Sequence, residues 1–182
     1  RPANHPQCNQ VLLDNGIAVL APDVRGSSGY GKSYLKLDDW ELREDSVKDI
    51  GALIDWVSTE PDLDESRICI MGRSYGGYMT LKCMQLFSDR IKCAVDTCGM
   101  SSLLSFLESI PEWRRDLRRP EYGDERLPHI REWMINDAPL TNVHHMNVPA
   151  LILQGAKDSR VPIKQAFQIF KALEDKGLSP WL

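Results

Sequence analysis

Short, almost continuous apolar runs alternate along the chain with longer stretches in which apolar residues recur every three or four positions. The short runs are typical of parallel β-strands that are covered on both faces, and the recurring pattern is typical of amphipathic helices. The runs predict strands at residues 16–21, 67–71, 92–95 and 149–154. The recurring patterns predict helices around residues 47–57, 78–86 and 167–173, the last of them ended by Lys176-Gly177. This alternation predicts an α/β protein with a parallel sheet and right-handed crossovers.

Two stretches depart from the alternation. Residues 24–34 are rich in Gly and Ser and predict a loop. Residues 101–145 are longer than one crossover helix needs, and such excursions in α/β proteins are usually lids or binding loops. We therefore expect a lid-like excursion at about 101–145. Its Trp113 and Trp133 line a substrate pocket or belong to the core of small helices, and the sequence leaves both interpretations open.

Size and charge set limits on the class of protein. The chain has 182 residues, which fits one domain with a core large enough to fold without disulfides or metals. The net charge of -4 argues against a nucleic-acid partner, which would require a clustered basic face. The basic run at 114–119 is interleaved with acidic residues and predicts a solvated, salt-bridged helix. No window of about 18 consecutive apolar residues occurs, so we expect no membrane span.

The cysteines argue against a metal or dithiol centre. The five cysteines are odd in number and form no C-x-x-C pair, which excludes zinc-ribbon and thioredoxin-type sites. Cys69 and Cys83 lie in apolar runs and are expected to be buried free thiols. Free thiols favour a reducing compartment, so a cytoplasmic location is predicted. We expect neither a metal nor an organic cofactor.

Residues 72–77 form a G-x-S-x-G motif between a predicted strand and a predicted helix, the context of a nucleophile elbow. The sharp turn needs small neighbours, which Gly72 and Gly76 provide, and Gly77 would let the helix pack close to the neighbouring strand. Ser74 is then expected to be a nucleophile with a strained backbone and an exposed hydroxyl. The Tyr75 N–H, at the positive end of the helix, would be one oxyanion donor. The alternative is an ordinary glycine-rich strand-to-helix turn.

A serine nucleophile needs a base that is oriented by an acid. Asp158 is the candidate acid because it follows the predicted strand 149–154, and sites form at the carboxyl ends of parallel strands. The alternative is that Asp158 only caps a loop. In the hydrolase order of Ser, acid and then His, the base should follow Asp158, yet no histidine does. All four histidines precede Asp158: His5, His129, His144 and His145. We expect His144 and His145, just before the predicted strand 149–154, to lie in a surface loop.

Four segments together resemble the prolyl oligopeptidase family, in particular its acylaminoacyl-peptidase-like branch of α/β hydrolases. They cover almost the whole chain in the family's order: APDVRGSSGYG at 21–31, GRSYGGY at 72–78, EYGD at 121–124 and QGAKDSRVP at 154–162. The resemblance implies that Ser74 is the nucleophile and Asp158 the triad acid. It also implies that Arg160 binds substrate near its carbonyl, although in some members this arginine is structural.

The chain also departs from the family pattern. The family's triad His lies beyond a strand that should begin near residues 179–182, and its Gly-Gly-Pro oxyanion turn precedes the segment at 15–17. The resemblance thus implies a partial α/β-hydrolase catalytic domain over residues 1–182, with helices on both faces of the sheet and both ends cut. It implies a serine peptidase that cleaves peptide or acyl-aminoacyl bonds, with this chain alone inactive. The alternatives are an inactive remnant or binding module that retains the fold, and a carboxylesterase.

Overall fold

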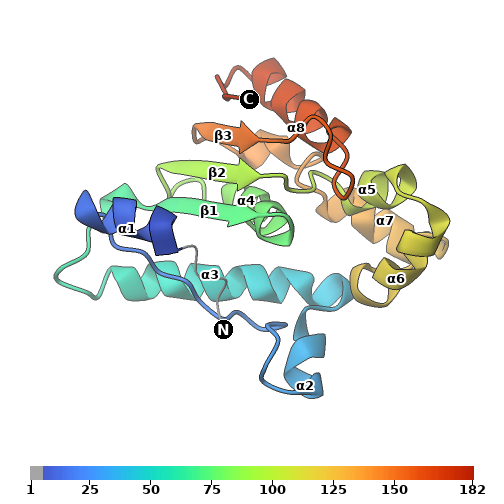
Figure 1. Cartoon of the computed structure of the whole chain (residues 1–182), viewed down its shortest axis with the longest axis horizontal. Helices are drawn as coiled ribbons and strands as arrows, with labels where there is room; N and C mark the ends of the chain where they lie inside the picture. Colours follow the sequence, from blue (N-terminus) through green and yellow to red (C-terminus); the bar gives the residue numbers. More distant parts are fainter. Residues whose placement is uncertain (1–5) are drawn as a thin grey trace. The chain divides into compact units, whose positions relative to one another are not determined.

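A computed structural model of the protein describes residues 6–182, which divide into two compact units, one ending at Asp64 and one spanning Glu65–Leu182. The first unit contains α1 (Pro6–Asp14), α2 (Lys32–Leu35) and α3 (Arg43–Val57) (Figure 1). Two short 3₁₀ turns, Lys36–Asp38 and Trp40–Leu42, connect α2 to α3. Helix α3 confirms the helix predicted around 47–57 and begins earlier than that pattern indicates.

The glycine-rich loop of the first unit is tied to α3. Arg25 donates its backbone N–H to Asp49 Oδ2 at 2.9 Å and its Nη2 to Asp49 Oδ1 at 2.6 Å. Hydrogen bonding to Arg25 lowers the pKa of Asp49. The predicted loop at 24–34 is therefore confirmed up to residue 31, and α2 replaces it from Lys32 onward. A two-sided contact to one carboxylate holds the start of the loop in place.

The strand predicted at residues 16–21 is wrong. After α1 ends, residues 17–24 run as irregular chain, and no strand occurs among the described residues up to Asp64. Ile17 and Leu20 stay 51% and 43% exposed. A strand exists only where a neighbour pairs with its N–H and C=O groups, and this run has no such neighbour within its unit. Apolar content alone could not reveal that.

The second unit contains a parallel sheet in the order β1-β2-β3, whose strands all point the same way in Figure 1. The strands are β1 (Cys69–Arg73), β2 (Cys93–Thr97) and β3 (Ala150–Leu153), which confirm the predictions at 67–71, 92–95 and 149–154. A parallel bridge joins Leu151 to Trp181, and the Ile152 N–H donates to the Trp181 carbonyl at 2.7 Å. Extended pairing beside β3 therefore begins where the family resemblance implies the next strand.

Helix α4 (Tyr75–Leu86) follows β1 and packs on β1 and β2, which confirms the helix predicted at 78–86. Cys83 of α4 is fully buried, as expected, but Cys69 is exposed, contrary to expectation. The reason is its place in the sheet. On β1 Cys69 shares a face with Met71 and Arg73, and all three are exposed, so this face of the strand is uncovered.

The excursion at 101–145 is a group of short helices: α5 (Leu103–Ser109), α6 (Glu112–Tyr122), α7 (Pro128–Asp137) and a 3₁₀ turn at Val143–His145. These helices share a core with Tyr78 of α4 and Val161, and Trp133 packs against that core. Trp133 therefore fits the core interpretation, whereas Trp113 is 65% exposed. The excursion is thus a packed layer next to the carboxyl end of the sheet (Figure 1).

Helix α8 (Lys164–Asp175) ends as the sequence predicted. Gly177 has a φ of 92°, the left-handed conformation that glycine adopts most easily. The Leu178 N–H donates to the Leu173 carbonyl at 3.0 Å, and the Gly177 N–H donates to the Glu174 carbonyl at 2.8 Å. This pair of bonds is a Schellman motif, which satisfies carbonyls at the helix end.

Candidate active site

Ser74 lies between the end of β1 and the start of α4, in a strained backbone conformation. Its φ of 58° and ψ of -115° are rare for a residue with a side chain. The Ser74 N–H donates to the Thr97 carbonyl of β2 at 2.8 Å, and the Ser74 carbonyl accepts the Tyr78 N–H at 3.1 Å. Ser74 itself is exposed. The strain and the exposure expected of a nucleophile elbow are both present.

Two of the three glycines in the motif are there because of close packing. A Cβ at Gly72 would lie 2.1 Å from the Gly76 carbonyl oxygen, and one at Gly77 would lie 2.6 Å from the Gly99 Cα. The steric roles predicted for Gly72 and Gly77 are confirmed. The role predicted for Gly76 is wrong, because a Cβ there meets nothing within 4 Å. Its missing side chain would point into open space and not into the turn.

Asp96 is a buried acid beneath the elbow that the sequence analysis did not single out. It is 2% exposed on β2, and its Oδ1 accepts the Gly99 N–H at 2.8 Å. A Cβ at either Gly77 or Gly99 would lie 2.3 Å from that oxygen, so the carboxylate fills the space between the two glycines. Burial raises the pKa of Asp96 to about 6, against the opposing effect of the Gly99 N–H. The available signal was one charged residue inside an apolar strand.

Asp158 lies in the loop after β3, at the same edge of the sheet as Ser74. Its Oδ1 accepts the backbone N–H groups of Val161 at 3.0 Å and of Arg160 at 2.7 Å. These bonds lower the pKa of Asp158, and the charges of Arg160 and Arg73 add to the effect. Arg73 immediately precedes Ser74, so a positive charge of the elbow acts on the Asp158 carboxylate. Asp158 therefore caps its own loop and is also an ionised carboxylate beside the elbow.

Arg160 is exposed, and its observed contact is the backbone bond to Asp158. This contact fits the structural role that the resemblance also allowed. Tyr75 is the first residue of α4, directly after Ser74, where an oxyanion donor is expected.

His144 and His145 lie at the other end of the strands from Ser74. His144 and His145 lie in a 3₁₀ turn that precedes β3, and their rings are 4.0 Å apart. Ser74 follows β1, and the strands are parallel, so these histidines lie at the opposite edge of the sheet. A strand of this length separates its two ends by roughly 13 Å. His129 is an exposed residue in the first turn of α7, and His5 lies outside the described residues.

The excursion touches both parts of the site. The Tyr75 ring stacks between Tyr78 at 6.0 Å and Tyr122 of α6 at 6.3 Å. From the same helix, Arg114 Nη1 donates to the Ser159 carbonyl at 2.8 Å, next to Asp158. Helix α6 thereby connects the residue after Ser74 to the residue after Asp158. No sequence pattern indicated this connection.

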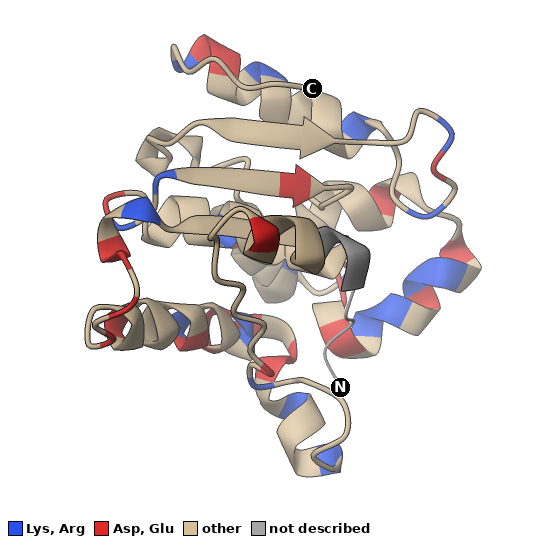
Figure 2. Ribbon diagram, turned by 60° about the vertical axis from the view of Figure 1, so that its left-hand side comes forward, with Lys and Arg blue, Asp and Glu red and all other residues tan. Residues whose placement is uncertain are grey.

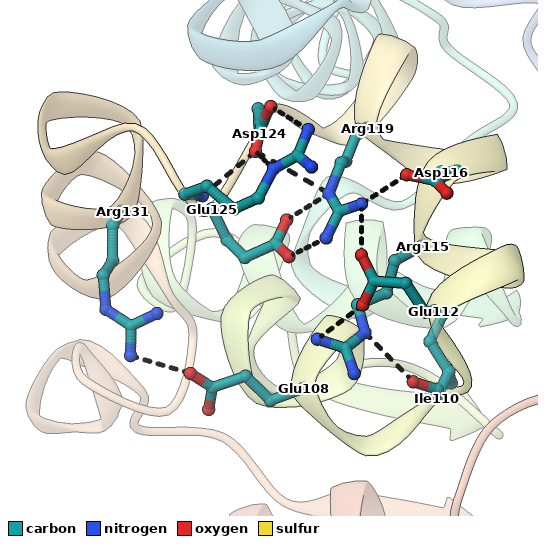
Figure 3. A network of polar contacts seen from close by, with 10 residues as sticks. Glu108, Ile110, Glu112, Arg115, Asp116, Arg119, Asp124, Glu125 and Arg131 are labelled. Atoms are coloured by element: carbon teal, nitrogen blue, oxygen red, sulfur yellow. Dashed lines mark hydrogen bonds and ion pairs between the residues drawn. The ribbon is translucent and has the colours of Figure 1, made fainter.

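Helix α6 alternates basic and acidic residues along its length (Figure 2), as the sequence predicted, but one of its arginines is buried. Arg119 is 6% exposed, and its Nη2 and Nε bind Glu125 Oε1 and Oε2 at 2.5 and 3.0 Å (Figure 3). Arg119 Nη1 also binds Glu112 at 2.8 Å, and it binds Asp116. Hydrogen bonding to these acids raises the pKa of Arg119. In turn, hydrogen bonding to Arg119 lowers the pKa of Glu125. The network fixes the turn after Tyr122.

The described residues contain no group of three or more His, Cys, Asp or Glu side chains placed to hold a metal ion. Within the same part of the chain, no helix has the length and apolarity that crossing a membrane requires.

Comparisons with known proteins agree with this geometry. The chain is 33% identical over 173 residues to dipeptidyl aminopeptidase BIII of Pseudoxanthomonas mexicana, an alignment that covers 93% of this chain and 25% of that protein. The acylaminoacyl peptidase of Pyrococcus horikoshii superposes with a TM-score of 0.78 at 26% identity, over 87% of this chain and 26% of that one. An acylaminoacyl peptidase in complex with Z-Gly-Gly-Phe-chloromethyl ketone superposes with a TM-score of 0.77 at 26% identity, over 87% and 25% of the two chains.

The chain thus spans about a quarter of the length of these relatives. The structural likeness confirms the predicted α/β-hydrolase fold, of which the chain holds a part. A family model described as the prolyl oligopeptidase family matches residues 5–180. This chain therefore belongs to the prolyl oligopeptidase family.

Proposed function

We propose that this chain provides the nucleophile and the acid of a serine peptidase that cleaves peptide or acyl-aminoacyl bonds. One observation carries the proposal: Ser74, strained and exposed at the start of α4, shares the carboxyl edge of the sheet with the ionised Asp158. The relatives support the choice of substrate, because they are named as peptidases and one is bound to a peptidyl chloromethyl ketone.

In the proposed mechanism the Ser74 hydroxyl attacks the substrate carbonyl while a histidine takes its proton, and water later hydrolyses the acyl-enzyme. Asp158 would accept the imidazole Nδ1–H and hold the tautomer that this step needs. Both loop N–H groups bind Oδ1, so Oδ2 carries no hydrogen bond from the described residues and faces no competition for the imidazole. Because His144 and His145 lie at the other end of the strands and no described histidine hydrogen-bonds to Ser74, we place the base outside the described residues 6–182.

The developing oxyanion would be bound by the Tyr75 N–H at the positive end of α4. Arg160 would stand beside the substrate carbonyl, in addition to its backbone bond to Asp158. Helix α6 supports both sides of this arrangement through Tyr122 and Arg114.

Two other functions remain as alternatives. A carboxylesterase would use the same elbow, and the peptidase is preferred because the relatives are peptidases. A binding module without catalysis is favoured because, among residues 6–182, no hydrogen bond joins Ser74 to a histidine. Cys69, Cys83, Cys93 and Cys98 are free thiols, which supports the proposal of a cytoplasmic location.

Active-site labelling tests the proposal. A longer form of the protein that includes a histidine after Asp158 should react with a fluorophosphonate probe at Ser74 alone. Ser74→Ala should abolish labelling, while the control Ser109→Ala, at an exposed serine of α5, should leave it intact. Labelling that persists in Ser74→Ala would overturn the assignment of the nucleophile.

A further inference from the structure

Two cysteines lie side by side at the amino-terminal ends of β1 and β2, away from Ser74. Cys69, the first residue of β1, is the direct ladder partner of Cys93, the first residue of β2. Paired residues on neighbouring strands are about 4.8 Å apart and point their side chains to the same face. That separation is within the range of about 4.4–6.8 Å that disulfides span between Cα atoms.

The two thiols interact and can be reached from solvent. Burial raises the pKa of Cys69 to about 12, and the neighbouring Cys93 thiol adds to the rise, in agreement with their pairing on the ladder. Cys69 still exposes part of its surface, and Cys93 is half-buried. By contrast, Cys83 is fully enclosed in the core beneath α4. The neighbouring pair thus differs from the buried thiol in both access and partner.

We propose that Cys69 and Cys93 form a redox modification site, in which a low-molecular-weight disulfide such as oxidised glutathione converts them to an intramolecular disulfide. One thiol attacks the glutathione disulfide, forms a mixed disulfide and releases one glutathione. The second thiol attacks the mixed disulfide, closes the Cys69–Cys93 bond and releases the second glutathione. The protein loses two electrons and two protons, and both are recovered in the two glutathione thiols.

The sheet makes this disulfide easy to reduce. Side chains on paired parallel strands stand almost perpendicular to the sheet, so their Cβ atoms lie near the strand spacing of about 4.8 Å, beyond the Cβ separation of about 3.5–4.5 Å in relaxed disulfides. Strained and exposed disulfides have higher reduction potentials and are the labile ones. The bond would therefore be reversible in a reducing compartment. It would fasten β1 to β2 at the end away from Ser74, so it is independent of the proposed catalysis.

Mass spectrometry of the whole 182-residue chain tests the site. After treatment with oxidised glutathione at pH 8, alkylation and tryptic digestion, the peptide 68–73 should be joined to the peptide 93–114, and dithiothreitol should separate them. Protection of Cys83 from alkylation in the same sample shows that the protein is folded.

Because peptide 93–114 also contains Cys98, the link should persist in Cys98→Ser and disappear in Cys93→Ser. A link that survives Cys93→Ser would overturn the proposal. Free thiols after oxidation, or a stable mixed disulfide without closure, would overturn it as well.

Discussion

Asp96 and Asp158 lie near the carboxyl ends of neighbouring strands, yet their surroundings shift their pKa values in opposite directions. Asp96 is enclosed beneath the elbow with one backbone N–H as its observed partner, and burial raises its pKa to about 6. Asp158 lies in a partly open loop, where two backbone N–H groups and nearby arginines lower its pKa. A position near the carboxyl ends of the strands therefore does not by itself determine whether a carboxyl group is ionised. Desolvation and hydrogen bonding fit Asp96 to a structural part and leave Asp158 charged, as the proposed mechanism requires.

The largest expected effect concerns Asp158. In a longer form of the protein that includes the base, Asp158→Asn should lower kcat by about 10⁴-fold, because the amide would hold the wrong histidine tautomer. The midpoint of urea unfolding should change little, since the Asn side-chain oxygen can still accept the two loop N–H bonds. Steady-state kinetics and urea titration check both halves, and near-normal turnover would show that the triad acid lies elsewhere.

Gly77 and Gly76 test the packing around Asp96. Gly77→Ala should destabilise the fold by about 3 kcal/mol, because its Cβ would overlap Asp96 Oδ1 and the backbone of Gly99. Gly76→Ala is the matched control. It meets nothing and should be neutral or stabilise α4 by up to about 1 kcal/mol. Urea unfolding of the two variants measures the difference, and equal losses would contradict the close approach.

The pH dependence of stability distinguishes the two acids. Asp96 binds its proton more tightly when folded, so its contribution is complete below about pH 4 and is lost as the pH rises to about 6, a change of up to about 3 kcal/mol. Asp158 has the opposite sign, and its contribution is present above about pH 4 and lost as the pH falls. Free energies of unfolding between pH 4 and 7 should therefore lose the Asp96 slope in Asp96→Asn and retain it in Asp158→Asn. The same slope in both variants would contradict the buried state of Asp96.

The smallest effect is expected at Arg114. Arg114→Ala removes the exposed hydrogen bond to the Ser159 carbonyl and should cost less than about 1 kcal/mol. Its effect should appear in the acid loop as faster amide hydrogen exchange at Arg160 and Val161. Arg131→Ala, which breaks the exposed pair with Glu108, is the control and should leave that loop unchanged. Unchanged exchange in Arg114→Ala would show that α6 does not support the loop.

The sequence predicted the parts of the fold that depend on local pattern. The strands before Ser74 and Asp158, the elbow and the glycine end of α8 follow from short runs and turn residues. What it missed depends on neighbours far along the chain. The run at 16–21 has the composition of a strand but no partner within its unit, and Cys69 is exposed because its face of β1 is uncovered. The Tyr75–Tyr122 stack and the burial of Arg119 arise from how the excursion folds back, which periodicity does not encode.

The central claim is that Ser74 and Asp158 share one edge of the sheet while His144 and His145 occupy the other. Hydrolysis of a p-nitrophenyl ester by the purified 182-residue chain tests it most directly. We predict a rate no higher than that of Ser74→Ala, because among the described residues 6–182 no histidine hydrogen-bonds to the Ser74 hydroxyl. Hydrolysis that is lost in Ser74→Ala and also in His144→Ala or His145→Ala would contradict the claim.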